Sequence, residues 1–223
     1  MIKNFKTWAF SDSSVQNSLG NNFSQKRMAL FKNQLQKLQK PIKILDVGGY
    51  EEFWVNAGLA NVQGIQITIL NLEAGISNYT NFEIVKGDGT NLSAYKNNSF
   101  DIGFSNSVIE HLYNRAQQKK MAEEIVRVGR YHYVQTPNKF FIIEPHYLLP
   151  YFQFIPKSIR FSILTKTKFS RFKKWSSNEA QQYLDEILLL SGKDMKELFP
   201  DSKLTKEKFM GMTKSFVVHN FEN

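Results

Sequence analysis

The sequence contains no cysteine, so neither a disulfide framework nor a thiolate metal site can form. It also lacks an uninterrupted apolar run of the ~18 residues that a membrane-spanning helix needs. The nearest run, residues 148–164, is broken by Pro150, Gln153, Pro156, Lys157 and Arg160. Residues 1–10 lack the apolar core and small-residue cleavage site of a secretory signal. We therefore expect a cytoplasmic protein.

Acidic residues are scarce relative to basic ones: 20 Asp and Glu stand against 29 Lys and Arg, for a net charge of +9. The excess is concentrated in residues 137–175, where eight basic residues accompany one acidic residue, Glu144. This segment carries +7, which leaves only +2 for the other 184 residues. Such a local basic surface indicates an anionic partner or an anionic membrane surface.

No internal repeat or low-complexity linker divides the 223 residues, and the length suits one α/β domain. We predict a single domain over residues 1–223. Within it, residues 1–40 form an N-terminal helical cap and residues 137–190 form an inserted lid. The cap includes an amphipathic helix over residues 23–40, in which Met28, Phe31, Leu35 and Leu38 follow spacings of three and four.

Strands and helices alternate along the rest of the chain. Apolar and β-branched runs predict strands at 42–47, 65–72, 83–85, 100–105 and 131–135, with helices over 51–60 and most of 108–129. Runs at 203–209 and 215–219 predict a terminal antiparallel pair. This order implies a mostly parallel seven-stranded sheet with helices on both faces. In such α/β sheets, ligands bind outside the carboxyl ends of the strands.

The first predicted strand ends in Asp46 and a glycine turn, with the sequence DVGG at residues 46–49. Glycine lets the backbone approach a ligand, and the start of the next helix offers N–H groups to a carboxylate. Asp46 can attract an ammonium group. Together these groups suit a ligand that carries both a carboxylate and an ammonium group. A tight strand–helix turn without any ligand is the alternative.

Polar residues also follow the second and third strands. Asn71 lies 23 residues after Gly48, where an acid or amide can bond ribose hydroxyls in nucleoside-binding α/β folds. Asp88, within the sequence GDG at 87–89, can accept a hydrogen bond from an adenine amino group. For each of them, a turn-forming residue without a ligand is the alternative.

The most specific stretch is FDIGFSNSVIEHL at residues 100–112. It resembles the signature that follows strand four in class I S-adenosylmethionine-dependent methyltransferases. The motifs ILDVGGY, ITILNLE and KGDGT precede it in the order and spacing of that family, and the resemblance covers residues 43–135. It implies a Rossmann-like fold with S-adenosylmethionine as cofactor. The sequence TPNKFFIIEPH, after strand five, is similar to bacterial methyltransferase-domain proteins of glycan gene clusters.

The resemblance also implies roles for the matching residues. Gly48 and Gly49 would line the methionine end of the cofactor, with Asp46 beneath them. Asn71 would hold the ribose hydroxyls, and Asp88 the adenine amino group. The backbone carbonyl of Asn106 would help to hold the ammonium. The full predicted cofactor set is Asp46, Gly48, Gly49, Asn71, Leu72, Asp88, Gly89, Asn106 and Ser107.

Two positions depart from the family pattern. Tyr50 stands where the family usually has glycine, and Asn71 where it usually has an acid. A neutral amide makes a weaker hydrogen bond than a carboxylate, and Glu73 is an alternative partner for the ribose. A relative that has lost catalysis is therefore an alternative interpretation.

The acceptor side offers three candidate catalytic residues, His111, Glu144 and His146. His111 follows the strand-four motif, and Pro145 restricts the backbone between the other two. Each can take the proton of a hydroxyl acceptor, while packing or a structural ion pair are the alternatives. Because a Glu–His pair lacks the third ligand of a metal site, we predict no metal.

The ten aromatic residues within 137–175, beside the basic ones, predict a cap over the acceptor pocket. A hydrophobic lid kept soluble by its lysines is the alternative. We predict O-methylation of a glycan or another small hydroxylated acceptor, free or lipid-linked, with peripheral membrane contact as a further prediction. Nucleic acid is a less favoured partner. The alternative function is a retired methyltransferase fold that binds an anionic membrane or RNA through this segment.

Overall fold

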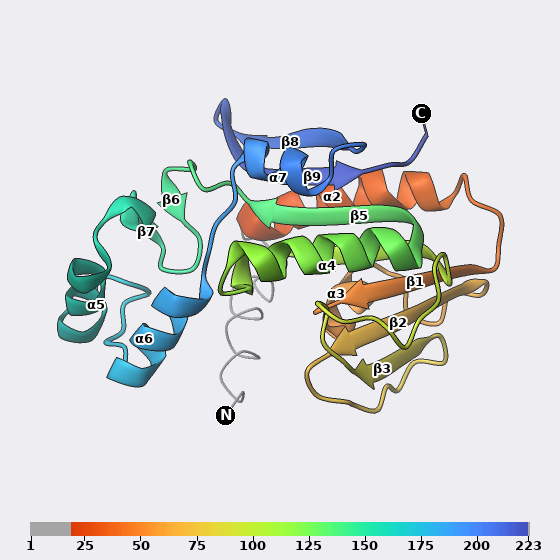
Figure 1. Cartoon of the computed structure of the whole chain (residues 1–223), viewed down its shortest axis with the longest axis horizontal. Helices are drawn as coiled ribbons and strands as arrows, with labels where there is room; N and C mark the ends of the chain where they lie inside the picture. Colours follow the sequence, from red (N-terminus) through yellow and green to blue (C-terminus); the bar gives the residue numbers. More distant parts are fainter. Residues whose placement is uncertain (1–18, 223) are drawn as a thin grey trace.

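The computed structural model describes residues 19–222. Its centre is a seven-stranded sheet (Figure 1). In spatial order the strands are β3 (Phe82–Lys86), β2 (Ile65–Asn71), β1 (Ile42–Val47), β4 (Phe100–Asn106), β5 (Gly129–Pro137), β9 (Met212–His219) and β8 (Lys203–Phe209). Neighbouring strands from β3 to β5 pair in parallel, and β9 pairs antiparallel with both β5 and β8. The predicted fold class is confirmed.

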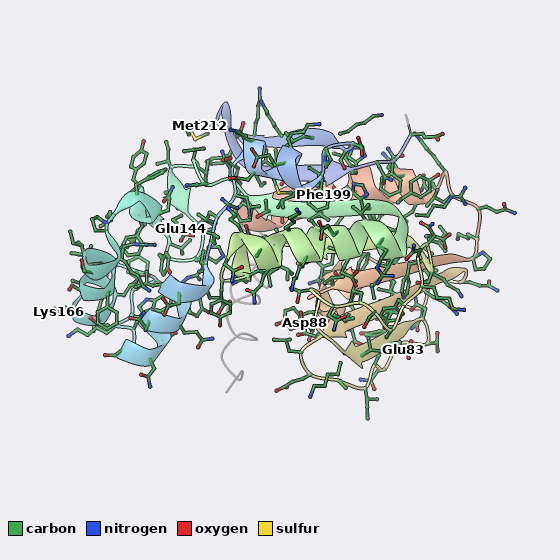
Figure 2. All side chains as sticks on the ribbon, in the orientation of Figure 1. Glu83, Asp88, Glu144, Lys166, Phe199 and Met212 are labelled. Carbon is green, nitrogen blue, oxygen red and sulfur yellow. The ribbon has the colours of Figure 1, made fainter. Side chains whose placement is uncertain are left out.

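Helices cover both faces because the central strands are apolar on both sides. In β1, for example, five of six residues are buried. On one face, α2 (Leu19–Leu35) and α3 (Glu51–Asn56) pack around Phe31 and Trp54. On the other, α4 (Arg115–Val128) and α7 (Gly192–Leu198) pack around Ile125 and Phe199, the latter labelled in Figure 2. Burial of both faces is what keeps parallel strands in the middle of a domain.

Two predicted helices end earlier than expected. α2 ends at Leu35 rather than at residue 40, because the N–H groups of Lys37 and Leu38 bond to carbonyls only three residues back. α3 ends at Asn56 rather than at residue 60, and the chain turns at Gly58 with φ 68°. Glycine adopts this conformation without strain.

The prediction that residues 108–129 are mainly helical is confirmed, although the helical residues fall into two separate elements. One 3₁₀ turn, η1 (Ile109–His111), is followed by a break, and α4 begins only at Arg115. The side chain of Asn114 caps α4 by accepting a hydrogen bond from the Gln117 N–H at 3.0 Å. Asparagine is a preferred N-cap residue, and this was the overlooked signal. The break presents residues 108–113 to the strand ends.

The terminal strand pair is confirmed, with one shift in its bounds. β9 begins at Met212 rather than at residue 215. Met210 and Gly211, between the two strands, have φ of 49° and 82°. Two consecutive positive φ values are typical of the turns that match the twist of a two-stranded hairpin.

We call residues 137–190 the lid. Its elements are β6 (Ile143–Glu144), β7 (Leu149–Pro150), η2 (Phe152–Phe154), α5 (Lys157–Lys166) and α6 (Ser177–Glu186). They form a lobe beyond the carboxyl end of β5 (Figure 1), with Lys166 on its outer side (Figure 2). The lobe has a hydrophobic cluster of its own, centred on Tyr147, Trp175 and Tyr183. A hydrogen bond of 2.9 Å from the Lys139 N–H to the Leu190 carbonyl closes its neck.

Within residues 19–222, no helix combines the length and the hydropathy needed to cross a bilayer. Residues 1–18, the first part of the predicted N-terminal cap, lie outside the described residues.

Candidate active site

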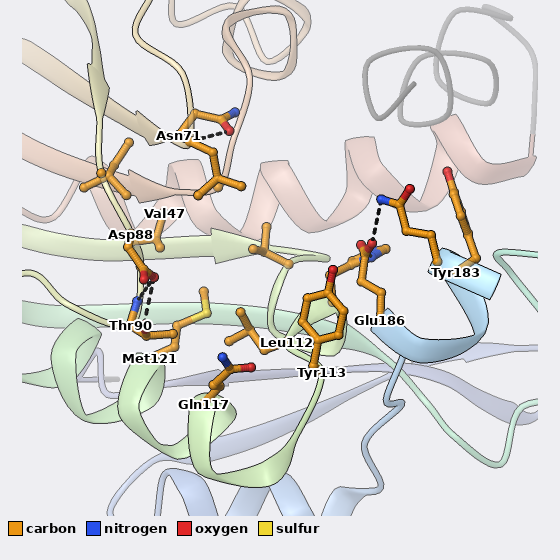
Figure 3. Close-up of a pocket in the computed structure, with 18 of the residues that line it drawn as sticks. Val47, Asn71, Asp88, Thr90, Leu112, Tyr113, Gln117, Met121, Tyr183 and Glu186 are labelled. Carbon is orange, nitrogen blue, oxygen red and sulfur yellow. Dashed lines mark hydrogen bonds and ion pairs between the residues drawn. The ribbon is translucent and has the colours of Figure 1, made fainter. Parts of the chain in front are cut away.

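A cavity of about 630 Å³ lies between the carboxyl ends of the strands and the lid. Figure 3 shows Asn71 and Asp88 on its strand side and Tyr183 and Glu186 on its lid side. The loop after β4, including His111, lines the cavity between them. Its size is typical of small-molecule sites. One cavity therefore joins the predicted cofactor edge to the lid.

Gly48 forms the sharp turn after β1. Its φ is 78°, and a Cβ atom there would lie 2.5 Å from Cγ1 of Val108. The Gly48 N–H bonds to the Leu70 carbonyl at 2.8 Å, which ties this turn to β2. Because no side chain fits, bare backbone lines the cavity here.

Asp46 lies beneath this turn and does not line the cavity. A Cβ atom on Gly49 would lie 1.7 Å from its Oδ2, so the carboxylate sits directly against the Gly49 backbone. Trp54 Nε1 donates to Oδ2 at 2.6 Å, whereas Oδ1 is buried without a partner among the described residues. Burial raises the pKa of Asp46 to about 7, although the Trp54 bond opposes this shift.

Asn71 uses its amide to hold its own loop. Its Nδ2 donates to the Gly49 carbonyl at 3.1 Å, and its Oδ1 accepts from the Leu72 N–H at 2.8 Å. Tyr50 lines the cavity where the family has glycine. Its hydroxyl is hydrogen-bonded to Asn71, while burial raises the pKa of Tyr50. Tyr50 and Asn71, the two residues that depart from the family pattern, therefore contact each other.

Asp88 combines the two roles that the sequence left open. Its Oδ1 accepts from the N–H and from the hydroxyl of Thr90, both at 2.8 Å, as a turn aspartate does. The same residue lines the cavity beside Gly89. A Cβ atom on Gly89 would lie 2.5 Å from Val47 Cγ1, so only glycine packs there.

Two predicted cofactor residues, Asn106 and Ser107, use their side chains in contacts outside the cavity lining. The Asn106 Oδ1 accepts a hydrogen bond from Arg27 of α2, and Arg27 also pairs with Glu207 at 2.9 Å. Ser107, with φ 55°, donates its hydroxyl to Gln135 at 2.8 Å. Of the predicted set, Gly48, Asn71, Leu72, Asp88 and Gly89 line the cavity, and Asp46, Gly49, Asn106 and Ser107 do not.

The three predicted catalytic residues lie together, in a buried chain of polar contacts. His146 Nδ1 is 2.6 Å from Glu144 Oε1, and His146 Nε2 is 3.2 Å from His111 Nε2. His111 Nδ1 in turn is 2.7 Å from Oε1 of Glu186 on α6. His111 and Glu186 line the cavity, whereas Glu144 and His146 lie behind them.

Glu110 adds a further acid to this cluster. It is fully buried, and its Oε2 accepts from the Thr136 hydroxyl at 3.0 Å. Its Oε1 has no partner among the described residues. Burial raises the pKa of Glu110, an effect that the charge of His111 opposes. Sequence reasoning missed both Glu110 and Glu186.

The expected aromatic cap over the pocket was wrong in its position. None of the ten aromatic residues of 137–175 lines the cavity, whose aromatic side chains are Tyr50, Tyr113 and Tyr183. Aromatics such as Tyr147 and Trp175 instead build the core of the lid. α6 is the lid helix that faces the cavity, since Ser176 to Glu186 supply the lid side of its lining.

The sheet order and the cavity at its carboxyl edge define a Rossmann-like α/β protein with its ligand site in the usual place for such sheets. Residues 12–132, more than half of the chain, match the family described as methyltransferase domain. The chain belongs to this family. Its predicted place among the S-adenosylmethionine-dependent methyltransferases, with that cofactor, is confirmed. No curated protein sequence matches the chain.

Three solved structures are similar to this chain in fold. The CurJ carbon methyltransferase has a TM-score of 0.61 at 11% identity, over 96% of this chain and 56% of that one. The N-terminal domain of EvdMO1, solved in the presence of SAH and D-fucose, has a TM-score of 0.52 at 15% identity, over 90% and 83%. A SAM-dependent methyltransferase from Methanosarcina mazei has a TM-score of 0.51 at 15% identity, over 85% and 95%.

Proposed function

We propose that this methyltransferase transfers a methyl group from S-adenosylmethionine to a hydroxyl group of a glycan or another small hydroxylated acceptor. The observation that carries the proposal is the continuity of one cavity from the strand-end loops to His111 and Glu186 under the lid. EvdMO1, which shares the fold, was solved with SAH and a sugar together. That likeness supports a sugar as the first acceptor to test.

The residues at the strand ends fit the cofactor. Gly48 offers backbone without a side chain, and Asp46 keeps a buried carboxylate oxygen without a partner just beneath it. An ammonium group near this turn would be attracted to that oxygen. We assign direct contacts to Gly48, Asn71, Leu72, Asp88 and Gly89. Asp46, Gly49, Asn106 and Ser107 then support the loops from behind.

The chemistry asks little of the protein beyond alignment and exclusion of water. Once bound, the cofactor would supply an activated methyl group to the acceptor oxygen, and the hydroxyl group would lose its proton. His111 and Glu186 line the cavity and can receive that proton. Because Glu144 and His146 do not reach the cavity, we assign them the role of positioning His111.

The first test is calorimetric titration of the protein with S-adenosylhomocysteine, which needs no acceptor. We expect micromolar binding. The next step is a screen for transfer of labelled methyl groups to sugars, phenols and amines, in which we expect a methyl ether on a sugar. Absence of binding by folded protein at millimolar product, or transfer to amines alone, would overturn the proposal.

A second candidate role is peripheral contact of the lid with an anionic membrane. Phe169 and Phe172 are 73% and 92% exposed, and lysines lie near both in the sequence. Exposed aromatics beside cations suit a membrane interface. Part of the basic excess is already committed, however, since Lys157 pairs with Asp185 and Lys173 pairs with Glu179 at 2.6 Å.

Sedimentation with phosphatidylserine vesicles tests this role. We expect binding that salt weakens and that the double variant Phe169→Ser/Phe172→Ser loses. Met210→Ser is the matched control, because Met210 is also 82% exposed but lies on the β8–β9 turn. The membrane role fails if the wild-type chain does not sediment, or if the control loses binding equally.

A further inference from the structure

Three groups that commonly bind metals meet where the lid joins the core. A carboxylate oxygen of Glu110 and ring nitrogens of His111 and His146 all lie within 4.8 Å of one another, and all three residues are buried. Glu110 and His111 follow β4, whereas His146 belongs to the lid. The sequence predicted no metal because the pair Glu144 and His146 had no third ligand. In the structure Glu110 and His111, and not Glu144, are the groups that lie with His146 as candidate ligands.

The partners of the two imidazoles fix their tautomers. His111 Nδ1 lies 2.7 Å from a Glu186 oxygen, and His146 Nδ1 lies 2.6 Å from a Glu144 oxygen. An ionised carboxylate only accepts hydrogen bonds, so each Nδ1 donates to its glutamate and the two Nε2 atoms face each other. A histidine that donates its other nitrogen to a carboxylate is the usual arrangement around protein-bound metals.

The two Nε2 atoms lie only 3.2 Å apart, with their rings nearly perpendicular at 80°. Zinc–nitrogen bonds are about 2.0–2.1 Å long, and two ligands of a tetrahedral ion are then about 3.3 Å apart. The observed separation matches that edge. A direct hydrogen bond between the two rings is the alternative explanation of this contact.

Glu110 distinguishes these two explanations. A hydrogen bond between the histidines gives no partner to the buried Oε1 of Glu110, and an unpaired buried carboxylate oxygen is costly. Thr136 holds the other oxygen at 3.0 Å, so the carboxylate is already oriented.

We propose that Glu110, His111 and His146 bind a divalent first-row transition-metal ion, such as Zn²⁺. Two imidazoles and one carboxylate suit such ions better than Mg²⁺ or Ca²⁺, which prefer oxygen ligands. Of the three residues, His111 is the one that lines the cavity. With an ion on its Nε2, His111 would no longer receive a proton, and Glu186 would take that of the acceptor hydroxyl, which a nearby ion makes easier to lose. This use in turnover rests on the proposed function, whereas metal binding itself does not.

Metal binding would also hold the lid on the core, since the ligands come from both. An ion that binds only the folded chain raises its melting temperature. Removal of the metal is therefore expected to lower the melting temperature and to loosen residues 143–147 first, which hydrogen exchange can follow.

The experiment uses the whole chain, freed of metal by chelator and titrated with Zn²⁺ and with Co²⁺. We expect one equivalent of either ion and the visible spectrum of four-coordinate cobalt. Glu110→Gln and His146→Gln should weaken binding by at least about tenfold, and Glu144→Gln, which keeps all three ligands, should weaken it less. His132→Gln is the matched control, because His132 is equally buried but bonds to Ser202.

Titration of the same samples with S-adenosylhomocysteine separates the two proposals. Product binding without stoichiometric metal would overturn the metal site and leave the proposed function standing. Metal binding without product binding would do the reverse. If the Glu110 and His146 variants bind metal as the wild type and the His132 control do, the ion lies elsewhere and the assignment is wrong.

Discussion

The two sides of the cavity are built in different ways. On the strand side, each cofactor residue lies within a few positions of the end of a strand, so the sheet alone places Gly48, Asn71 and Asp88 together. On the lid side, the polar cluster is assembled from segments far apart, such as His111 and Glu186, which are separated by 75 residues. Local geometry therefore defines the cofactor side, and tertiary packing defines the acceptor side.

The largest expected effect lies on the strand side. Gly48→Arg should abolish S-adenosylhomocysteine binding, because even a Cβ atom meets Val108 at 2.5 Å and the φ of 78° disfavours a side chain. Gly211→Arg is the matched control, since Gly211 also has a positive φ, of 82°, but nothing lies within 4 Å of an added Cβ atom. Calorimetry checks both variants, with circular dichroism to verify folding. Retained binding in Gly48→Arg would remove this turn from the cofactor site.

The sequence predicted the strand side of the cavity better than the lid side. The strand-end residues were found because a buried strand and a glycine turn form a local pattern, and the strands of the sheet were found for the same reason. Glu186 was missed because a glutamate on an amphipathic helix carries no signal of what it will face. The lid aromatics were assigned to the pocket because composition cannot separate the core of a lobe, such as Trp175, from the wall of a cavity.

The next effect concerns the buried carboxyl group of Asp46 and the pH dependence of stability. Burial raises its pKa from 3.8 to about 7, so the folded chain keeps a proton that the unfolded chain releases. This stabilisation is complete below the unfolded pKa and is lost as pH rises toward 7. The loss is at most about 4 kcal/mol, at 1.36 kcal/mol per pH unit. Asp46→Asn should keep the hydrogen bond from Trp54. Its free energy of unfolding should rise relative to that of the wild type as pH increases over that range, which urea unfolding can measure.

The contribution of His132 to the free energy of unfolding has the opposite pH dependence, so it must be measured apart from that of Asp46. Burial lowers the pKa of His132 to about 4, so its neutral form stabilises the folded chain above pH 6.5 and this stabilisation is lost as pH falls toward 4. At pH 5 the loss is about 2 kcal/mol. His132→Gln should show a smaller fall in stability from pH 7 to pH 5 than the wild type does. Parallel curves for the two proteins would contradict this assignment.

The lid side is tested by turnover rather than by product binding. His111→Gln should lower kcat by about 10²–10⁴-fold, the range for loss of a general base, while S-adenosylhomocysteine affinity changes little. Glu179→Gln on α6 is the matched control, because Glu179 also lines the cavity but pairs with Lys173. Kinetics with the acceptor found in the screen provide the measurement. Equal losses in both variants would mean that His111 has no specific role as a base.

The smallest expected effect is at Asp88. Two variants are needed there, because one alone would not distinguish its role in the turn from its role as a ligand of the cofactor. Asp88→Asn retains a side-chain oxygen for the two bonds from Thr90, so only the charge of the acceptor changes. We expect about a twofold loss of product affinity, because an adenine amino group bonds more strongly to a charged acceptor. Asp88→Ala removes both roles and should weaken product affinity about tenfold, or by roughly 1.4 kcal/mol.

If calorimetry shows that Asp88→Asn binds as weakly as Asp88→Ala, the charge itself is needed, and Asp88 acts through more than the adenine amino group. If neither variant loses affinity, Asp88 is a turn residue alone, and the strand side would then rest on Gly48 and its neighbours.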